Sequence, residues 1–457
     1  MVVFRQNRGL GRALAAVAVP GFMVAALLAA GVAMGESNAA PHNALASTGS
    51  RSQLRPLLDP QTAAPVPLTV WTASAEVALL AELDRLSQSV VDGGHAPGMA
   101  WVLVSQGRLV DARGYGVTDI NRRGQVGPQT VFRLASLSKA FASALTGLLV
   151  DQGVIEWSDR VQDLVPALLL KDDAGAGHLR IDELLSHRVG LPHNTYDRQI
   201  ESEQPYPLLV EKLNQISPLC HVGDCYAYQN VAFSLIGDVV FAATGDFFSH
   251  QVEKRLFHPL GMTTATYGRD ALFASPSYAS PHVRSRGRWL AVTPKETYYR
   301  LPPAAGVNAS ALDMGQWLLA QLGHRPDVLP ENLVSILHEP QVLTPGEVGG
   351  SGWRRERLHA AAYALGWRVF DYAGHDLIFH AGAVQGYRAV LGLLPAEDFG
   401  FAVLWNAESG VPSGVFPTAL DRRLALPEHD WLQPTRIAKP RKTTPGKRLR
   451  VSSGSSR

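Results

Sequence analysis

The spacing of apolar residues predicts a helix, a hairpin and a buried helix in the first third of the chain. Residues 74–91 place apolar side chains at helical intervals, with a serine and a glutamate near the start that favour a helix N-terminus. Two short apolar runs, 99–104 and 109–115, are joined by three turn-forming residues, which is typical of a hairpin. Residues 131–149 form an apolar run with a short polar start, which predicts a buried helix.

The periodicity changes again further along the chain. The pattern from Ser136 to about Leu322 is mainly helical with long loops. It predicts helices at 181–186 and 231–243 and irregular segments at 192–207 and 275–293. Short strands separated by glycines follow, at 363–370, 377–380, 387–394 and 401–405, and a closing helix is expected at 415–424.

These elements predict an α/β fold of the α+β type, in which both ends of one domain supply an antiparallel sheet flanked by helices. A mainly helical lobe is inserted between the two halves of the sheet. We expect this domain to span residues 73–434, preceded by a linker at 40–72 and followed by a basic, disordered tail at 435–457.

Charge is distributed unevenly over the 457 residues. The formal net charge is +2, but Arg436 to Arg457 contains eight basic residues and no acidic one, so the rest of the chain is net acidic. A nucleic-acid-binding surface on the domain is therefore not expected, and nucleic acid is not a predicted partner.

The first 39 residues have the pattern of an export signal or a membrane anchor. Arg5, Arg8 and Arg12 precede an uncharged, mostly apolar run from Ala13 to Met34. The run is long for a cleaved signal and long enough to span a bilayer, so both interpretations remain open. Either one predicts an exported domain, periplasmic or extracellular, with possible anchoring in the membrane.

The chain contains two cysteines, Cys220 and Cys225. In an oxidising compartment the leading interpretation is a disulfide across a short loop. A zinc site is the alternative, but only His221 and Asp224 lie close by as further ligands, and zinc requires about four. No metal is therefore expected.

The first candidate for chemistry is Ser136 with Lys139, because residues three apart on a helix share one face. A lysine in an apolar helix is desolvated, which lowers its pKa, so the pair has the form of a nucleophile beside its base. Ser138 fits less well, since neighbouring helical side chains diverge by about 100°. The structural alternative is a helix-capping serine with a snorkelling lysine.

Two further segments contain candidate groups. Tyr228 and Asn230 lie two apart before an apolar helix, so both can project into one cleft, the tyrosine as an acid or base and the amide as a partner of substrate or lysine. His380 ends a predicted strand and is followed by Gly382 and Ala383, where an open strand edge can bind a carbonyl oxygen. The alternatives are a packed tyrosine, an N-cap asparagine and a structural histidine.

Other chemistries have little support in the sequence. It contains no GxSxG, P-loop or HExxH motif. A histidine-based triad can be drawn from Asp119, His187 and a distant serine, but such members meet only in space, and spacing alone cannot assemble them.

Three motifs in order, SLSK at 136–139, YQN at 228–230 and HAG at 380–382, resemble the serine β-lactamase and penicillin-binding protein superfamily. The similarity is greatest to its class C branch, with the related esterases and D-amino-acid peptidases, and it extends over about residues 75–426. The segments LLSHRVGLP, HPLGM and YALGW agree with it.

The resemblance implies two lobes that meet at the site, with no metal or organic cofactor. It implies that Ser136 is the acylated nucleophile, that Lys139 helps to deprotonate it and that Tyr228 transfers protons to the leaving group and from the deacylating water. Asn230 would orient the substrate, and the N–H groups of Ser136 and Ala383 would form the oxyanion hole.

The third motif departs from the β-lactamase pattern, because His380 stands where those enzymes usually have lysine. Histidine is largely neutral at pH 7 and binds a carboxylate less firmly, so efficient β-lactam hydrolysis is not expected. We expect an exported serine hydrolase of esters, D-amino-acid-containing peptides or amides, with β-lactams as secondary substrates. A tethered cell-wall-peptide sensor that acylates without turnover is the alternative, and an inactive scaffold a third. No oligomeric state follows from the sequence.

Overall fold

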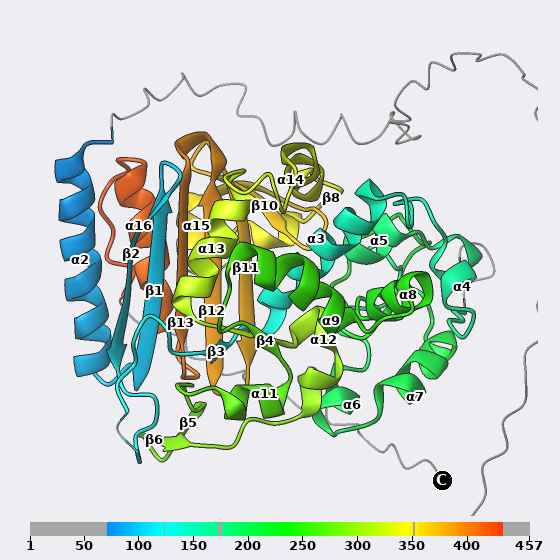
Figure 1. Cartoon of the computed structure of the whole chain (residues 1–457), viewed down its shortest axis with the longest axis horizontal. Helices are drawn as coiled ribbons and strands as arrows, with labels where there is room; N and C mark the ends of the chain where they lie inside the picture. Colours follow the sequence, from blue (N-terminus) through cyan, green and yellow to red (C-terminus); the bar gives the residue numbers. More distant parts are fainter. Residues whose placement is uncertain (1–70, 123, 172–175, 351, 433–457) are drawn as a thin grey trace, which may run out of the picture. The chain divides into compact units, whose positions relative to one another are not determined.

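An eight-stranded antiparallel sheet is the centre of the fold, with strand order β2-β1-β13-β12-β11-β10-β9-β8 (Figure 1). The structure is a computed structural model that describes residues 71–122, 124–171, 176–350 and 352–432. The expected export segment, most of the expected linker and the expected basic tail lie outside the described residues. The sheet order confirms that both ends of the domain supply strands, since β1 pairs with β13.

The strands of the large sheet are β1 (Gly98–Ser105), β2 (Arg108–Gly116), β8 (Val342–Leu343), β9 (Leu358–Tyr363), β10 (Arg368–Tyr372), β11 (His375–Val384), β12 (Tyr387–Leu394) and β13 (Phe399–Trp405). Short turns join β1 to β2 and each successive pair from β9 to β13, whereas the inserted lobe lies between β2 and β8. Two small sheets contain β3 (Phe132–Arg133), β4 (Thr266–Tyr267) and β7 (Val307–Ala309), and β5 (His282–Ser285) with β6 (Arg288–Ala291).

The helices fall into those that cover the sheet and those of the inserted lobe. The first group contains α2 (Ala73–Asp92), α13 (Ala311–Gln321), α14 (Glu331–His338), α15 (Trp353–Arg357) and α16 (Val415–Arg423). The rest are α3 (Ser138–Asp151), α4 (Val161–Leu164), α5 (Ile181–Leu185), α6 (Asp197–Glu201), α7 (Tyr206–Glu211), α8 (Leu235–Thr244), α9 (Phe248–Val252), α10 (His258–Leu260), α11 (Arg269–Ala274) and α12 (Pro302–Ala305). None of the helices in the described part of the chain has the length and hydropathy needed to cross a bilayer.

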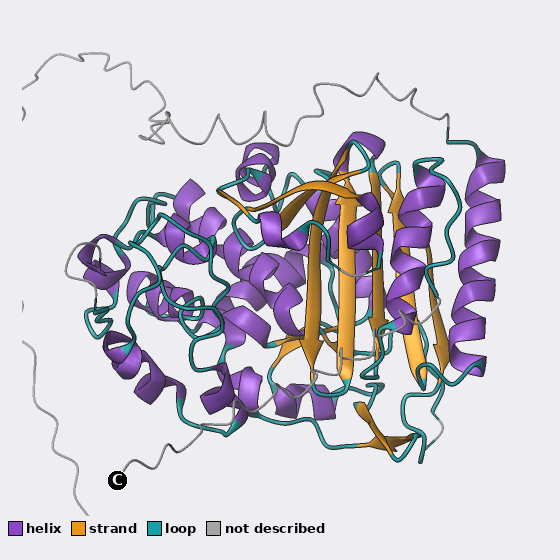
Figure 2. Ribbon diagram, turned by 180° about the vertical axis from the view of Figure 1, so that it is seen from behind, coloured by secondary structure: helices purple, strands orange, loops and turns teal. Residues whose placement is uncertain are grey.

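Helices cover both faces of the sheet (Figure 2), and the sheet separates two hydrophobic clusters. Alternate residues of β1 face opposite sides, so Trp101 packs with α2 and α16 while Val102 packs with the cluster that contains α3 and α13. All eight residues of β1 are buried, as expected for a strand covered on both faces.

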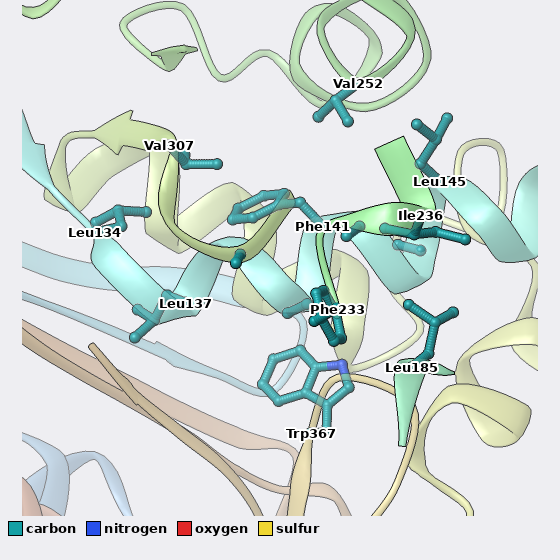
Figure 3. Close-up of a cluster of buried hydrophobic side chains, with 14 of the residues drawn as sticks. Leu134, Leu137, Phe141, Leu145, Leu185, Phe233, Ile236, Val252, Val307 and Trp367 are labelled. Carbon is teal, nitrogen blue, oxygen red and sulfur yellow. The ribbon is translucent and has the colours of Figure 1, made fainter. Parts of the chain in front are cut away.

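The helix α3 is the core of the helical lobe (Figure 3). Its residues from Ser138 to Leu149 are all buried, and Phe141 stacks on Trp317 of α13 with ring centroids 4.0 Å apart. Because apolar side chains surround α3, any polar group on it must find its partner within the protein.

Several predicted elements differ from the observed ones. Residues 363–370 are not one strand, because Gly366 adopts φ +74° in a turn between β9 and β10. The segment 192–207 contains α6, and 275–293 contains the β5–β6 hairpin, so neither is wholly irregular. The helix expected from residue 231 begins at Leu235. The helices α2 and α16 and the β1–β2 hairpin lie where the sequence predicted them.

Candidate active site

Ser136 lies in a single 3-10 turn, η1 (Ala135–Leu137), immediately before α3. Ala135 has φ +52°, a conformation that is uncommon for a residue with a side chain. Strain of this kind costs about 1–3 kcal/mol and persists only where the surroundings impose it. Ser136 is partly exposed, whereas both of its neighbours in the turn are buried. The turn therefore presents a single hydroxyl to solvent.

The Lys139 amine is completely buried beside this serine. Its Nζ donates to Asn230 Oδ1 at 2.7 Å and to the backbone oxygen of Ala304 at 3.1 Å, and it lies 3.5 Å from Ser136 Oγ. It also lies 4.7 Å from the ring centroid of Tyr228. The structure thus places the side chains of Ser136 and Lys139 next to each other, as the sequence predicted. Ser138 instead donates to Ala135 O and accepts from Val307 N–H, as a structural hydroxyl does.

Burial lowers the pKa of Lys139 well below its usual value. The carboxylate of Asp197 partly opposes this change, and the charge of Arg368 adds to it. The neutral amine, which is the form able to accept a proton, is therefore more populated at a given pH here than for a lysine in water.

The ring of Tyr228 lies beside the Lys139 amine. Burial raises the pKa of its hydroxyl, although the hydrogen bond with Ser136 and the charge of Arg368 oppose the increase. Desolvation of the phenolate thus outweighs the attraction of the neighbouring positive charge. The resting group is a phenol that can donate its proton.

Asn230 connects Lys139 to a carboxylate that the sequence analysis missed. Its Oδ1 accepts from Lys139, and its Nδ2 donates to Asp197 Oδ2 at 2.8 Å, so the amide has one orientation. Burial raises the pKa of Asp197, with the hydrogen bond from Asn230 opposing the change. No local signal identifies Asp197, since an acidic residue in a first helical turn is common.

The strand β11 brings the third motif against the serine turn. The backbone of Gly382 packs so closely on the turn that a Cβ there would lie 2.0 Å from Leu134 O. The strand continues through this motif to Val384, so the expectation that it ends at His380 is wrong. Its pairing with β10 stops at Phe379, opposite Arg368. On that side, residues 380–384 form the open edge that the sequence predicted, and Ala383 is exposed there.

The ring of His380 is buried and lies against Tyr363, whose hydroxyl is 3.3 Å from Nε2. Its Nδ1 lies 2.8 Å from Ala381 O, which fits an Nδ1–H donor and an Nε2 acceptor. Burial, with the charges of Arg368 and Lys139, lowers the pKa of His380 well below its usual value. The neutral histidine expected from the sequence agrees with this environment.

A permanent positive charge does border the site, on Arg368 at the start of β10. Its guanidinium lies 5.7 Å from the ring centroids of Tyr228 and Tyr363. Glu347 accepts hydrogen bonds from both Arg368 and Arg354. Nothing in the sequence pattern identifies this cluster, because its members are separated in the chain and meet only in the folded protein.

The histidine-based triad is not assembled. Asp119 interacts with Ser280 and His282. His187 is fully buried, lies against Tyr228 with ring centroids 4.3 Å apart and accepts the backbone N–H of Gln229 at its Nδ1. Among the described residues no group of three or more histidine, cysteine, aspartate or glutamate side chains is placed to bind a metal.

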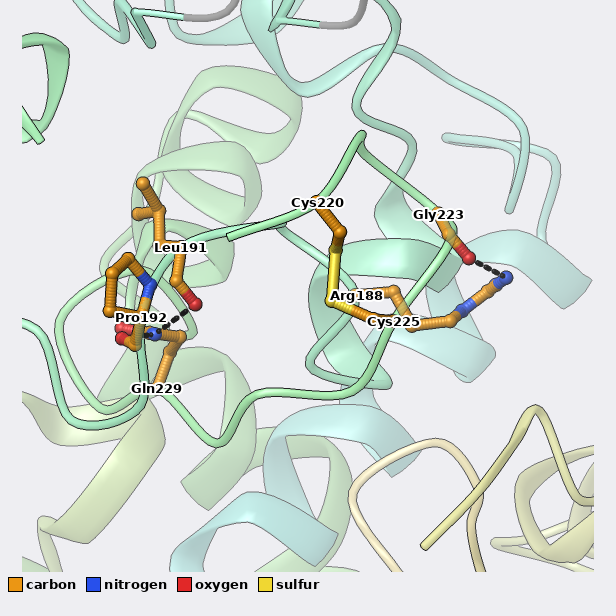
Figure 4. Close-up of a disulfide and its surroundings, with 7 residues drawn as sticks. All are labelled: Arg188, Leu191, Pro192, Cys220, Gly223, Cys225 and Gln229. Carbon is orange, nitrogen blue, oxygen red and sulfur yellow. Dashed lines mark hydrogen bonds between the residues drawn. A yellow bond between two sulfur atoms is a disulfide. The ribbon is translucent and has the colours of Figure 1, made fainter. Parts of the chain in front are cut away.

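A disulfide joins Cys220 and Cys225 in the loop before Tyr228 (Figure 4). The loop packs on the segment 187–192, where Gly190 O accepts Leu219 N–H at 2.7 Å and Arg188 Nη1 donates to Gly223 O. A short covalent loop of this kind restricts the backbone that leads to Tyr228.

A family model described as Beta-lactamase matches residues 83–426. Among curated proteins, "Unguisins hydrolase ungD'" of Aspergillus campestris is 25% identical over 346 residues, covering 73% of this chain and 62% of that protein. "Protein flp" of Staphylococcus aureus is 25% identical over 342 residues, covering 72% and 63%. The chain therefore spans less than two thirds of the length of these relatives.

Solved structures share the fold. The octameric penicillin-binding protein homologue from Pyrococcus abyssi superposes with a TM-score of 0.67 at 19% identity, covering 76% of this chain and 78% of that one. "EstCE1, a hydrolase with promiscuous acyltransferase activity" superposes with a TM-score of 0.65 at 18% identity, covering 77% and 100%.

The close approach at Gly382 predicts the effect of adding one methyl group. Gly382→Ala should push β11 away from the serine turn and lower the acylation rate by about a hundredfold, since displacements near 1 Å have effects of this size. The rate is measured from the burst phase with p-nitrophenyl acetate, and circular dichroism checks the fold. Gly410→Ala is the control, because a Cβ there meets nothing within 4 Å. Equal burst rates in both variants would contradict the prediction.

The disulfide predicts that Cys220 and Cys225 resist alkylation in the native protein until a reductant is added. Replacing both with serine should lower the free energy of unfolding by about 2 kcal/mol, the value expected for so short a loop. Mass spectrometry after iodoacetamide treatment, and denaturant unfolding, measure the two effects. Labelling of both cysteines without reductant would show that the bond is absent.

Proposed function

The chain belongs to the beta-lactamase family, and on that basis we propose that it is an exported serine hydrolase that works through an acyl-enzyme. The observation that supports this most directly is the buried Lys139 amine 3.5 Å from the partly exposed Ser136 hydroxyl. A depressed lysine pKa beside a serine on a strained turn is the arrangement expected of a nucleophile with its base.

In the proposed first half-reaction, Ser136 Oγ attacks the substrate carbonyl carbon and its proton passes to Lys139 Nζ. The phenol of Tyr228 then gives its proton to the leaving group as the carbonyl–leaving-group bond breaks. The raised pKa of Tyr228 supports this order, because the resting group already bears the proton. An ester between the acyl group and Ser136 results.

In the second half-reaction, the phenolate of Tyr228 takes a proton from water, and the resulting hydroxide attacks the acyl carbon. Ser136 Oγ leaves with the proton held on Lys139, which restores all three groups. The N–H groups of Ser136 and Ala383 are proposed to bind the oxyanion in both steps. Losing one such donor costs about 3 kcal/mol, or roughly a hundredfold in rate. Asn230 orients Lys139 and the substrate.

We propose esters and D-amino-acid-containing peptides or amides as substrates, with β-lactams secondary. The low pKa of buried His380 supports the lower rank of β-lactams, because this group offers no permanent charge to a carboxylate. A curated relative named a hydrolase and a structural neighbour described as a hydrolase with acyltransferase activity are consistent with this range. Export is proposed from Arg5, Arg8, Arg12 and the apolar run after them.

The decisive experiment incubates the full chain and Ser136→Ala with p-nitrophenyl acetate, D-alanyl peptides and nitrocefin, and follows product and intact mass. We expect many products per chain and a transient acyl adduct in the parent, with both lost in the variant. A stable adduct without turnover would instead indicate a sensor that acylates once. Undiminished turnover in Ser136→Ala would contradict the proposed nucleophile.

The low pKa of Lys139 predicts how acylation depends on pH. Acylation should slow as the pH falls through that pKa, because the protonated ammonium cannot accept the serine proton, and the midpoint should lie well below the usual 10.5. Lys139→Ala should keep its fold and lose acylation by at least about a hundredfold. Lys254→Ala, at an exposed position, is the control. Normal labelling of Lys139→Ala in a single-turnover assay would rule out Lys139 as the base.

A further inference from the structure

A groove of about 750 Å³ adjoins the catalytic residues but does not include Ser136. It is bounded by the disulfide loop, by β8 and by η6 (Pro345–Glu347). His193 lines the groove and stacks on Tyr228 with centroids 6.0 Å apart, and Glu347 lines it and binds Arg368. His193 therefore connects the groove directly to the tyrosine that is proposed to protonate the leaving group.

Besides the Tyr226 hydroxyl, two buried oxygen atoms on residues that line this groove have no hydrogen-bond partner among the described residues. They are Gln341 Oε1 and Thr344 Oγ1, on residues that are 8% and 4% exposed. The backbone N–H groups of the same residues donate to Tyr363 O and Ala361 O, each at 2.8 Å, so the main chain is fixed. Unpaired buried polar atoms are rare, and these two have the chemistry to accept a donor or, for the hydroxyl, also to donate.

The charged side chains of the groove already have opposite charges beside them. Glu347 binds Arg354 and Arg368, and Arg188 lies 3.7 Å from Asp182. Apart from Asp224, which is exposed, the groups left to a ligand are therefore neutral: these two oxygens, the Tyr226 hydroxyl and the ring of His193. This composition favours a neutral ligand that is rich in N–H and C=O groups over a phosphate or a free carboxylate.

The open side of β8, at the edge of the large sheet, is a second indication that the groove binds a peptide-like ligand. The strand β8 is the last of the eight, paired with β9 on one side, and Val342 and Leu343 line the groove. A strand with an open side can pair with an extended peptide through main-chain hydrogen bonds. The unpartnered oxygens flank this strand at positions 341 and 344.

We propose that the groove is a subsite for the main chain of a peptide-like substrate, in which Gln341 Oε1 accepts an amide N–H and Thr344 Oγ1 donates to an amide carbonyl. This inference rests on the proposed function, since the bound segment is an extension of the molecule that acylates Ser136. It selects amide-containing substrates over alkyl esters of the same length.

The test compares four esters: p-nitrophenyl acetate, an ester with an N-acetyl-D-alanyl dipeptide in its acyl part, one with the same dipeptide in its alcohol part, and an alkyl ester of equal length. The parent should prefer one dipeptide ester over the alkyl ester. Thr344→Val and Gln341→Leu should each lower kcat/KM for that ester about fivefold, mainly through KM, as expected for one hydrogen bond. Turnover of p-nitrophenyl acetate should not change.

Thr418→Val is the matched control, because this buried threonine on α16 donates to Gly414 O and does not line the groove. The midpoint of thermal unfolding should not fall in Thr344→Val, whose hydroxyl has no partner to lose, and should fall in Thr418→Val. Turnover of p-nitrophenyl acetate without a preference for a dipeptide ester, or equal losses of activity on all four esters, would overturn the proposed peptide subsite. Neither result would contradict the proposed hydrolase function. Absence of turnover with every ester would contradict the proposed function itself.

Discussion

Complete burial of the Lys139 amine is the constraint on which the site depends. An ammonium group without water is unstable unless it is paired, so the protein surrounds this one with Asn230 Oδ1, Ala304 O and the face of Tyr228. Those three groups come from two separate segments of the helical lobe, residues 228–230 and α12. Stabilising the lysine therefore also assembles the groups proposed for proton transfer.

Two glycines allow neighbouring backbones to pack closely on α3 and on the serine turn before it. Gly382 on β11 packs against Leu134 O beside the serine turn, and a Cβ on Gly366 would lie 2.7 Å from Lys139 O. A side chain at either position would collide with the neighbouring backbone, so both must be glycine. Gly366 also has a positive φ, which residues with a side chain rarely adopt. The strained conformation of Ala135 persists because the sheet and α3 hold the turn between them.

Charge at the site comes from outside the three motifs. His380 is neutral and buried, whereas Arg368, one strand away, contacts the rings of Tyr228 and Tyr363. Because Glu347 binds Arg368 and also lines the adjoining groove, the electrostatics of the catalytic residues and the polarity of the proposed peptide subsite depend on one carboxylate. A substrate that enters the groove therefore encounters paired charges and unpaired neutral oxygens.

The resemblance of three ordered motifs identified the family. The sequence by itself also determined the two-ended sheet and the pairing of Ser136 with Lys139, because these depend on periodicity and on spacing within one helical turn. It also determined the proximity of Cys220 to Cys225. Only the tertiary structure decided that burial keeps Tyr228 a phenol, that Asp197 orients Asn230 and that Arg368 supplies the nearby charge. Desolvation and long-range contacts depend on what surrounds a group in space, and the linear order of residues does not contain that information.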